Sequence, residues 1–204
     1  TTCRLFNFVA QFKKPHLYGV REVEELMVNW KSVEYHTPIS VGKFKATFYN
    51  AGHILGSAFI LVEVEGKKII FSGDLGNSPA PIIGAREELP ADLQYLVIES
   101  TYGNRTHELV SERKGILEDA IEDTVRSGGV LMIPAFAMER TQELLYEIND
   151  LVENGRIPKI LVFLDSPLAI KLPDVYSSHE KYWDKKLIHK SSESMTSAVS
   201  LTAI

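Results

Sequence analysis

Three short segments each place a histidine or a carboxylate beside glycines, at the edge of an apolar run typical of a strand. They contain His53 (residues 51–58), Asp74 (residues 71–76) and Glu99 (residues 98–103). A rigid scaffold presents functional side chains where a strand gives way to a loop. A neutral imidazole together with a carboxylate suits a divalent ion such as zinc or manganese. Catalytic zinc takes three protein ligands and a water, so this pair alone is an incomplete set.

A turn centred on Glu65-Gly66 or on Gly66-Lys67 determines whether His53 and Asp74 can meet. It separates two β-rich runs, at residues 58–64 and 67–71, and so predicts a β-hairpin. Counting back from the turn places Asp74 opposite Ser57 or Phe59, where facing Cβ atoms are about 5 Å apart. His53 lies a few residues further along the same arm and can fold back. Taken singly, His53 reads as a loop residue and Asp74 as a turn former; on two arms of one hairpin, they favour a metal site.

The spacing of apolar residues predicts the elements that must hold these side chains. A helix is expected over 20–30 and a strand over 44–49, ahead of the hairpin. After it, a short strand over 95–98 is followed by alternating helices and strands. The predicted helices span 111–126 and 138–153, and the predicted strands span 130–133 and 160–164. Strand–helix–strand–helix–strand is the pattern of a parallel α/β layer, and pattern alone puts 95–98 into that same sheet.

The composition is that of a globular chain, and it excludes a disordered or collagen-like protein. The 204 residues are 45% hydrophobic and 24% charged, with a formal net charge of -5. No apolar run reaches the roughly 18 residues of a membrane span, so we expect no membrane partner. Cys3 is the single cysteine and cannot form an internal disulfide, so a reducing cytoplasm is the simplest location. An acidic chain that binds a polyanion needs a metal or a local basic patch to do so.

Longer stretches around these residues resemble a known family. Residues 51–58 and 71–74 look like the third and fourth metal-ligand motifs of the metallo-β-lactamase superfamily. Glu99-Ser100-Thr101-Tyr102-Gly103 looks like the first signature motif of its β-CASP branch of RNA-processing nucleases, which includes ribonuclease J and the 3′-end-processing endonuclease. The stretches at 128–137, 139–143 and 164–169 are similar to the start of the β-CASP cassette. The likeness covers roughly Tyr18 to Tyr182.

The resemblance implies a fold and a chemistry. The fold would be α/β: part of a metallo-β-lactamase αββα sandwich (1–107), followed by the start of a parallel, Rossmann-like β-CASP domain (108–204). It moves the 95–98 strand into the first of these sheets. The implied activity is hydrolysis of RNA phosphodiester bonds by a metal-bound hydroxide, with two divalent ions, zinc by preference and manganese as the alternative.

The resemblance also implies roles for individual residues. His53 would bind one metal and Asp74 would bridge two. Glu99 would orient a histidine from a later motif that protonates the leaving oxygen. Substrate contacts are predicted at four further positions: Thr101, His107, Arg140 and Ser166. For Arg140 an exposed pair with a residue four positions away is an equal alternative, and Ser166 also suits a helix start.

The sequence departs from the family pattern in one respect. The cluster His-x-His-x-Asp-His occurs nowhere among the six histidines, and neither His179 nor His189 matches the later β-CASP histidine motifs. We therefore expect this chain to be a central piece of a longer enzyme, inactive by itself. The full-length enzyme would act on single-stranded RNA, with a homodimer as one option for its assembly. The alternatives are a non-catalytic β-CASP scaffold subunit and a hydrolase of small substrates with the metallo-β-lactamase fold.

Overall fold

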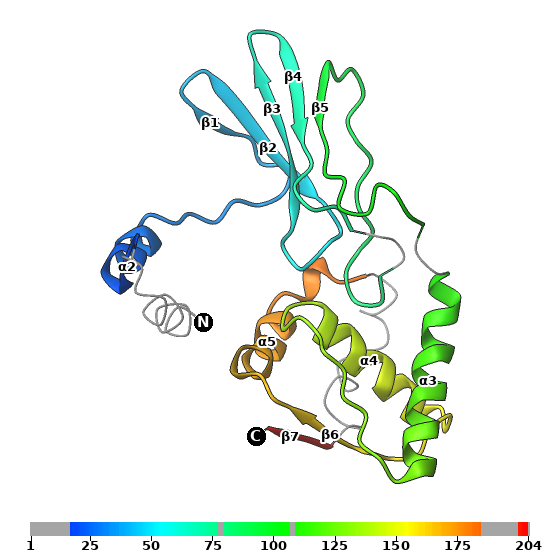
Figure 1. The fold of residues 1–204 in the computed structure, drawn as a ribbon. Coiled ribbons are helices and arrows are strands. Elements are labelled where there is room, and N and C mark those ends of the chain that lie inside the picture. The colour runs from blue at the N-terminus through cyan, green and yellow to red at the C-terminus, as the bar shows by residue number, and fades with distance from the viewer. Residues whose placement is uncertain (1–16, 77–79, 107–108, 185–199, 204) are drawn as a thin grey trace. The chain divides into compact units, whose positions relative to one another are not determined.

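The computed structural model describes residues 17–76, 80–106, 109–184 and 200–203 (Figure 1). The chain divides into two compact units, residues 1–34 and 35–204. In the first unit, helix α2 (Val20–Val28) begins after Gly19, whose N–H donates to Glu22 Oε2 at 2.7 Å. This helix confirms the amphipathic pattern, although it ends before Trp30. Every helix in the described part of the chain is too short or too polar to cross a lipid bilayer. The predicted domain boundary at residues 107–108 stays a prediction.

A five-stranded mixed sheet dominates the first part of the second unit. Its strands follow one another in chain order: β1 (Ile39–Val41), β2 (Phe44–Asn50), β3 (Ala58–Val64), β4 (Lys67–Phe71) and β5 (Tyr95–Val97). The pairs β1–β2, β2–β3 and β3–β4 are antiparallel, and β5 runs parallel to β4. The placement of β5 confirms the expectation from the family resemblance and overturns the one from pattern alone, which joined this strand to the later α/β layer.

The β3–β4 hairpin forms with the first of the two predicted turns. Val64 pairs with Lys67, so the turn centres on Glu65-Gly66, and the same register continues as far as Ile60 opposite Phe71. Extending this register brings Asp74 to the level of Ser57. One face of the sheet buries Phe59, Leu61 and Ile70, which together with Ala51 form one hydrophobic core cluster.

Helices dominate the second part of this unit (Figure 1). They are α3 (Val110–Ser127), α4 (Arg140–Glu153), α5 (Pro167–Ser177) and the short 3₁₀ turn η1 (Glu180–Tyr182). Strands β6 (Leu161–Leu164) and β7 (Ser200–Ala203) pair in parallel. The α/β class is confirmed, and the helices predicted over 111–126 and 138–153 are present with shifted ends.

The prediction of a strand over 130–133 is wrong, because these residues form no strand in the described part of the chain. No backbone ladder joins this segment to any strand in the described part of the chain, and Val130 and Met132 are 88% and 84% exposed. An apolar run favours a strand only where a neighbouring strand can pair with it. The apolar residues of this segment indicate that it can form a strand, but they do not show whether a neighbouring strand is available to pair with it.

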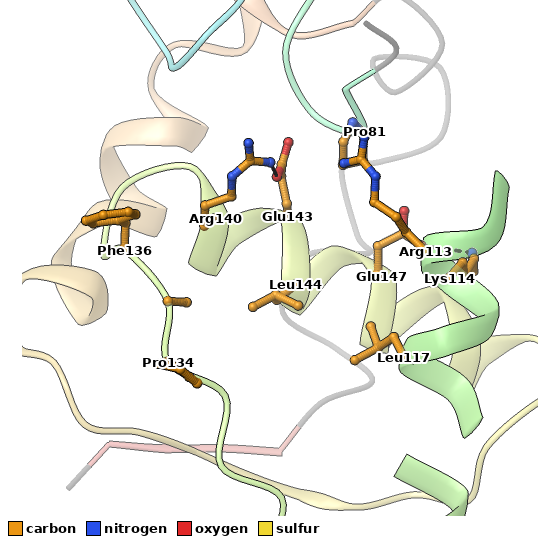
Figure 2. A pocket seen from close by; sticks show the side chains of 11 residues that line it. Pro81, Arg113, Lys114, Leu117, Pro134, Phe136, Arg140, Glu143, Leu144 and Glu147 are labelled. Atoms are coloured by element: carbon orange, nitrogen blue, oxygen red, sulfur yellow. Dashed lines mark hydrogen bonds and ion pairs between the residues drawn. The ribbon is translucent and has the colours of Figure 1, made fainter. Parts of the chain in front are cut away.

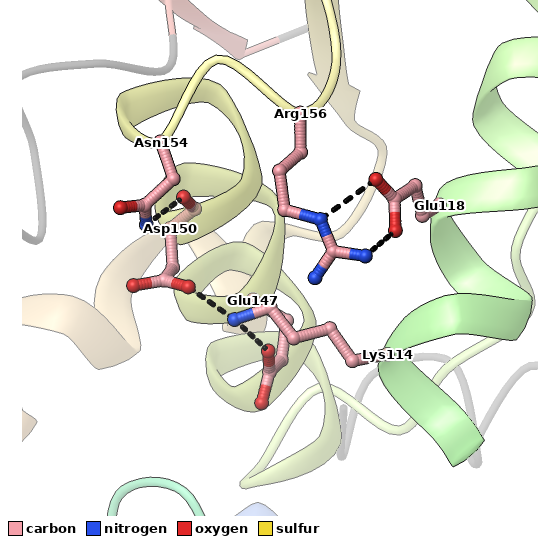
Figure 3. A network of polar contacts seen from close by, with 6 residues as sticks. All are labelled: Lys114, Glu118, Glu147, Asp150, Asn154 and Arg156. Carbon is pink, nitrogen blue, oxygen red and sulfur yellow. Dashed lines mark hydrogen bonds and ion pairs between the residues drawn. The ribbon is translucent and has the colours of Figure 1, made fainter. Parts of the chain in front are cut away.

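Apolar packing and ion pairs join α3 to α4. Ile121 of α3 is buried against Ile148 and Leu151 of α4. Figure 3 shows Lys114 of α3 between the carboxylates of Glu147 and Asp150, and Arg156 held by both oxygens of Glu118. Two-pronged pairs of this kind fix orientation as well as adding attraction. They hold α4, and Arg156 just after its end, against α3.

Candidate metal centre

The two predicted metal ligands lie close together. His53 Nε2 is 3.9 Å from Asp74 Oδ2, and the two side chains are 36% and 75% exposed. Two donor atoms that each lie about 2.0–2.2 Å from one ion are at most about 4.4 Å apart, so the observed separation is within reach of a shared cation. An imidazole nitrogen with a carboxylate oxygen fits zinc or manganese. Across the described ranges, no group of three His, Cys, Asp or Glu side chains is arranged to hold a metal ion.

The loop that carries His53 is held by its own hydrogen bonds. Ser57 Oγ accepts from the backbone N–H groups of His53 (3.0 Å) and Ile54 (3.2 Å), and Ser57 N–H donates to Ile54 O at 2.9 Å. Tyr35 donates its hydroxyl to Ser57 O at 2.8 Å, and burial raises the pKa of Tyr35 to about 12, so it stays a donor. The Gly-His-Ile-Leu-Gly-Ser segment thus forms a closed turn at the end of β2.

Two glycines let this loop meet its neighbours. Gly52 has φ +63°, and a Cβ there would lie 2.5 Å from the backbone nitrogen of Arg86. Gly76 follows Asp74, and its N–H donates to Ala51 O at 2.9 Å; a Cβ on Gly76 would lie 1.5 Å from Gly52 O. Only residues without a side chain permit this approach. Gly76 therefore allows the Asp74 segment to lie beside the His53 loop, and Gly52 allows that loop to lie against the backbone of Arg86.

Glu99 lies beside the same segment. Its Oε1 accepts from Leu75 N–H at 2.9 Å, its Oε2 accepts from Thr101 N–H at 3.2 Å, and its own N–H donates to buried Ser72 Oγ at 2.9 Å. The Leu75 and Thr101 hydrogen bonds hold the pKa of Glu99 below its ordinary value, with a smaller contribution from His53. Glu99 is thus a carboxylate that fixes the backbone next to Asp74.

The predicted substrate contacts lie in different surroundings. Thr101 is exposed and bonded to Glu99 through its backbone. Ser166 caps α5, accepting from Ala169 N–H at 3.3 Å, with Pro167 at the first helical position. This is the structural interpretation that the sequence left open, and a substrate contact by Ser166 stays a prediction. His107 lies outside the described residues.

Arg140 lines a cavity of about 710 Å³ beside α3 and α4. Figure 2 shows Arg140, Glu143 and Arg113 extending in the same direction, toward the segment that holds Pro81. Arg140 pairs with Glu143 at 2.6 Å, three positions away. The alternative weighed from the sequence, an exposed pair with a residue four positions away, is wrong, because position 144 is Leu and position 136 is Phe. A substrate contact by Arg140 stays a prediction. Arg113 and Phe136, which is 82% exposed, also line this cavity and were not predicted. Arg113 lies near the start of a helix and Phe136 lies in a loop, and nothing in the sequence around either residue predicts that they line one cavity.

Comparisons with known proteins support the resemblance. Residues 141–203 match the family model of the Beta-Casp domain. The chain is 32% identical over 170 residues to Ribonuclease TTHA0252 of Thermus thermophilus, covering 83% of this chain and 39% of the relative. It is 35% identical over 179 residues to an RNase J-like protein of Methanocaldococcus jannaschii, covering 83% and 41%. It is 32% identical over 190 residues to Endoribonuclease YSH1 of Eremothecium gossypii, covering 89% and 24%.

The chain thus spans from about a quarter to two fifths of the length of these relatives. The matches relate the chain to the metallo-β-lactamase superfamily and, within it, to the β-CASP branch, whose domain model matches residues 141–203. They support the resemblance inferred from the residues around His53, Asp74 and Glu99.

Proposed function

We propose that this chain contributes part of the active site of a metal-dependent ribonuclease. The observation on which this depends is the 3.9 Å separation of His53 Nε2 and Asp74 Oδ2, in a chain whose relatives are named ribonucleases and endoribonucleases. Neither a scaffold subunit nor a small-substrate hydrolase is favoured by those names. The roles of all site residues below are part of this proposal.

His53 and Asp74 would hold divalent cations together with ligands from outside the described residues. The cations would supply a more acidic water and positive charge that neutralises the phosphate. Asp74, with two oxygens and 75% exposure, has room to bridge two ions. Glu99 would keep the Asp74 segment in place by accepting the hydrogen bond from Leu75 N–H, and this bond also lowers the pKa of Glu99.

The test compares two imidazole–carboxylate pairs in the full-length protein. His53→Ala and Asp74→Asn should each lower the rate of metal-dependent RNA hydrolysis by about 100-fold or more, and a chelator should abolish it in the unmodified protein. His36→Ala is the matched control, because His36 Nε2 lies 3.1 Å from Glu87 Oε2 and is also solvent-exposed. Hydrolysis by the His53 variant at the rate of the control would refute the proposal.

We infer that the substrate is single-stranded RNA. Phe136 offers an exposed ring in the cavity that Arg140 and Arg113 also line, and an unpaired base can stack on such a ring while arginines contact its phosphates. Phe136→Ala should weaken the binding of a single-stranded oligonucleotide by about 10-fold and leave duplex binding unchanged. Phe44→Ala, which removes a 45% exposed ring from β2, is the control. Equal effects of the two variants would contradict the inference.

Three finer proposals accompany this function. Zinc is the preferred metal and manganese the alternative, because both accept imidazole and carboxylate ligands; activity restored to the metal-depleted protein by each ion in turn decides between them. A cytoplasmic location follows from the single cysteine, Cys3, which lies outside the described residues. A homodimer is tested by light scattering of the full-length protein.

A further inference from the structure

Glu139 is a buried carboxylate in unusual surroundings. It is 2% exposed, and its Oε2 accepts from the Tyr176 hydroxyl at 2.6 Å and from Leu55 N–H at 3.2 Å. Its Oε1 has no hydrogen-bond partner among the residues that the structure describes. The backbone at Glu139 has φ +63° and ψ −60°, outside the region that L-residues ordinarily occupy.

These features carry a cost that the local helix does not explain. Moving a carboxylate out of water without full hydrogen bonding is unfavourable, and so is a positive φ at a residue that has a side chain. Glu139 stands at the N-cap position of α4, but its side chain makes no capping hydrogen bond. Its two bonds instead reach across 84 and 37 residues, to Leu55 and to Tyr176 of α5.

Leu55 is the point where the His53 loop faces α4 and α5. The two preceding N–H groups, of His53 and Ile54, are satisfied inside the loop by Ser57 Oγ. The N–H of Leu55 has its acceptor outside the loop, in Glu139. The Leu55 side chain packs against the cluster of Ile82, Ile83, Leu172, Tyr176 and Trp183, which Ala137 also contacts. A polar and an apolar contact therefore fix the same residue, two positions from the predicted ligand.

We propose that Glu139 is a positioning residue for His53, which anchors the tip of the metal-ligand loop to helices α4 and α5. The proposal rests on the proposed function only in naming His53 as a ligand. The anchor joins the predicted metal site to the helical part of the chain, so a change at α4 or α5 is expected to reach the His53 loop through the part-buried hydrogen bond of Leu55 to Glu139.

The experiment compares two substitutions of similar size in the full-length protein. Glu139→Gln keeps an oxygen that can accept from Leu55 N–H, whereas Glu139→Leu fills the space without an acceptor. Amide hydrogen exchange at Leu55 should rise about 10- to 100-fold in E139L relative to the unmodified protein, and by no more than about 3-fold in E139Q. The dissociation constant for Mn²⁺ should rise about 10- to 100-fold in E139L alone.

Gln142→Ala is the matched control on the same helix. Gln142 is 1% exposed and donates to Ala137 O at 3.1 Å, but it makes no hydrogen bond to the His53 loop. It should lower the free energy of unfolding without accelerating exchange at Leu55 beyond the global change. Equal exchange at Leu55 in E139L and Q142A, or a loss in E139Q as large as in E139L, would overturn the proposal.

Tyr176→Phe provides a variant that keeps Glu139 and the Leu55 bond. Removing the hydroxyl frees one of the two anchors of the carboxylate, so exchange at Leu55 should rise about 3- to 10-fold; no rise would also overturn the proposal, even if E139L does not fold. Hydrogen exchange requires neither metal nor RNA. An unmodified protein that fails to hydrolyse RNA would therefore count against the proposed function and leave the anchoring result intact.

Discussion

Replacing Gly76 with alanine is the most direct perturbation of the predicted metal centre. Gly76 lies two residues after Asp74, and its N–H donates to Ala51 O at 2.9 Å, so two ligand segments touch at this point. A Cβ on residue 76 would lie 1.5 Å from Gly52 O, 2.0 Å from Gly52 C and 2.6 Å from His53 N. All three atoms belong to the backbone, so no side chain can rotate to make room.

The size of the effect follows from these distances. Real Cβ atoms essentially never approach other atoms closer than 3.0 Å, so the segments must separate by 1.5 Å, the difference between 3.0 and 1.5 Å. Overpacking commonly costs about 1–3 kcal/mol, and a clash with rigid backbone belongs at or above the upper end of that range. Metal sites tolerate about 0.2 Å in each ligand distance, so the same shift separates His53 from Asp74 as joint ligands.

The assay combines urea unfolding with a zinc or manganese titration of the full-length protein. We expect Gly76→Ala to lower the free energy of unfolding by about 3 kcal/mol or more and to abolish tight metal binding. Gly84→Ala is the matched control, because the nearest atom to a Cβ there is Asn50 Nδ2 at 3.8 Å, an ordinary contact. If both variants unfold and bind metal alike, the inferred contact between the two ligand segments is wrong.

Three further predictions concern the supports of the site. Ser72→Ala should destabilise the protein by about 0.5–1.5 kcal/mol in urea unfolding, because the part-buried N–H of Glu99 loses its acceptor; an unchanged midpoint would contradict this. Glu99 has a lowered pKa, so its ionised form stabilises the fold above its ordinary value of 4.5, and this stability is lost as the pH falls through the lowered pKa. Glu99→Gln should therefore flatten the acid side of the stability profile. A double-mutant cycle on Glu118 and Arg156, at 14% and 49% side-chain exposure, should yield a coupling of about 1 kcal/mol, and additive effects would show that the pair is not coupled.

The sequence predicted the hairpin with its correct ends because the determinants are local. Alternating apolar residues and the Glu65-Gly66 turn fix both the strands and their register, which Val64 opposite Lys67 confirms. Once the register is known, the level of Asp74 follows by counting. The 3.9 Å approach to His53 then depends on Gly52 and Gly76, whose close packing the spacing alone does not show.

Features that depend on distant partners were not predictable in this way. The run at 130–133 has the composition of a strand, but composition does not supply a neighbour. Glu139 precedes a helix, where an acidic residue ordinarily faces water, and nothing in its sequence context predicts burial against Leu55 and Tyr176. Both features depend on tertiary contacts, which override the preference of the local sequence for a strand or for an exposed side chain.

The basic residues around the cavity are largely paired with carboxylates. Arg140 is paired with Glu143, and Lys114 is shared by Glu147 and Asp150, so these basic residues are already largely neutralised by carboxylates. Arg113 is the cavity cation for which no ion pair is seen within the described ranges. In a chain of net charge -5, one arginine offsets little of the charge on an RNA backbone. We therefore expect a divalent ion held by His53 and Asp74 to add more positive charge than the one arginine of the cavity that lacks a carboxylate partner in the described ranges.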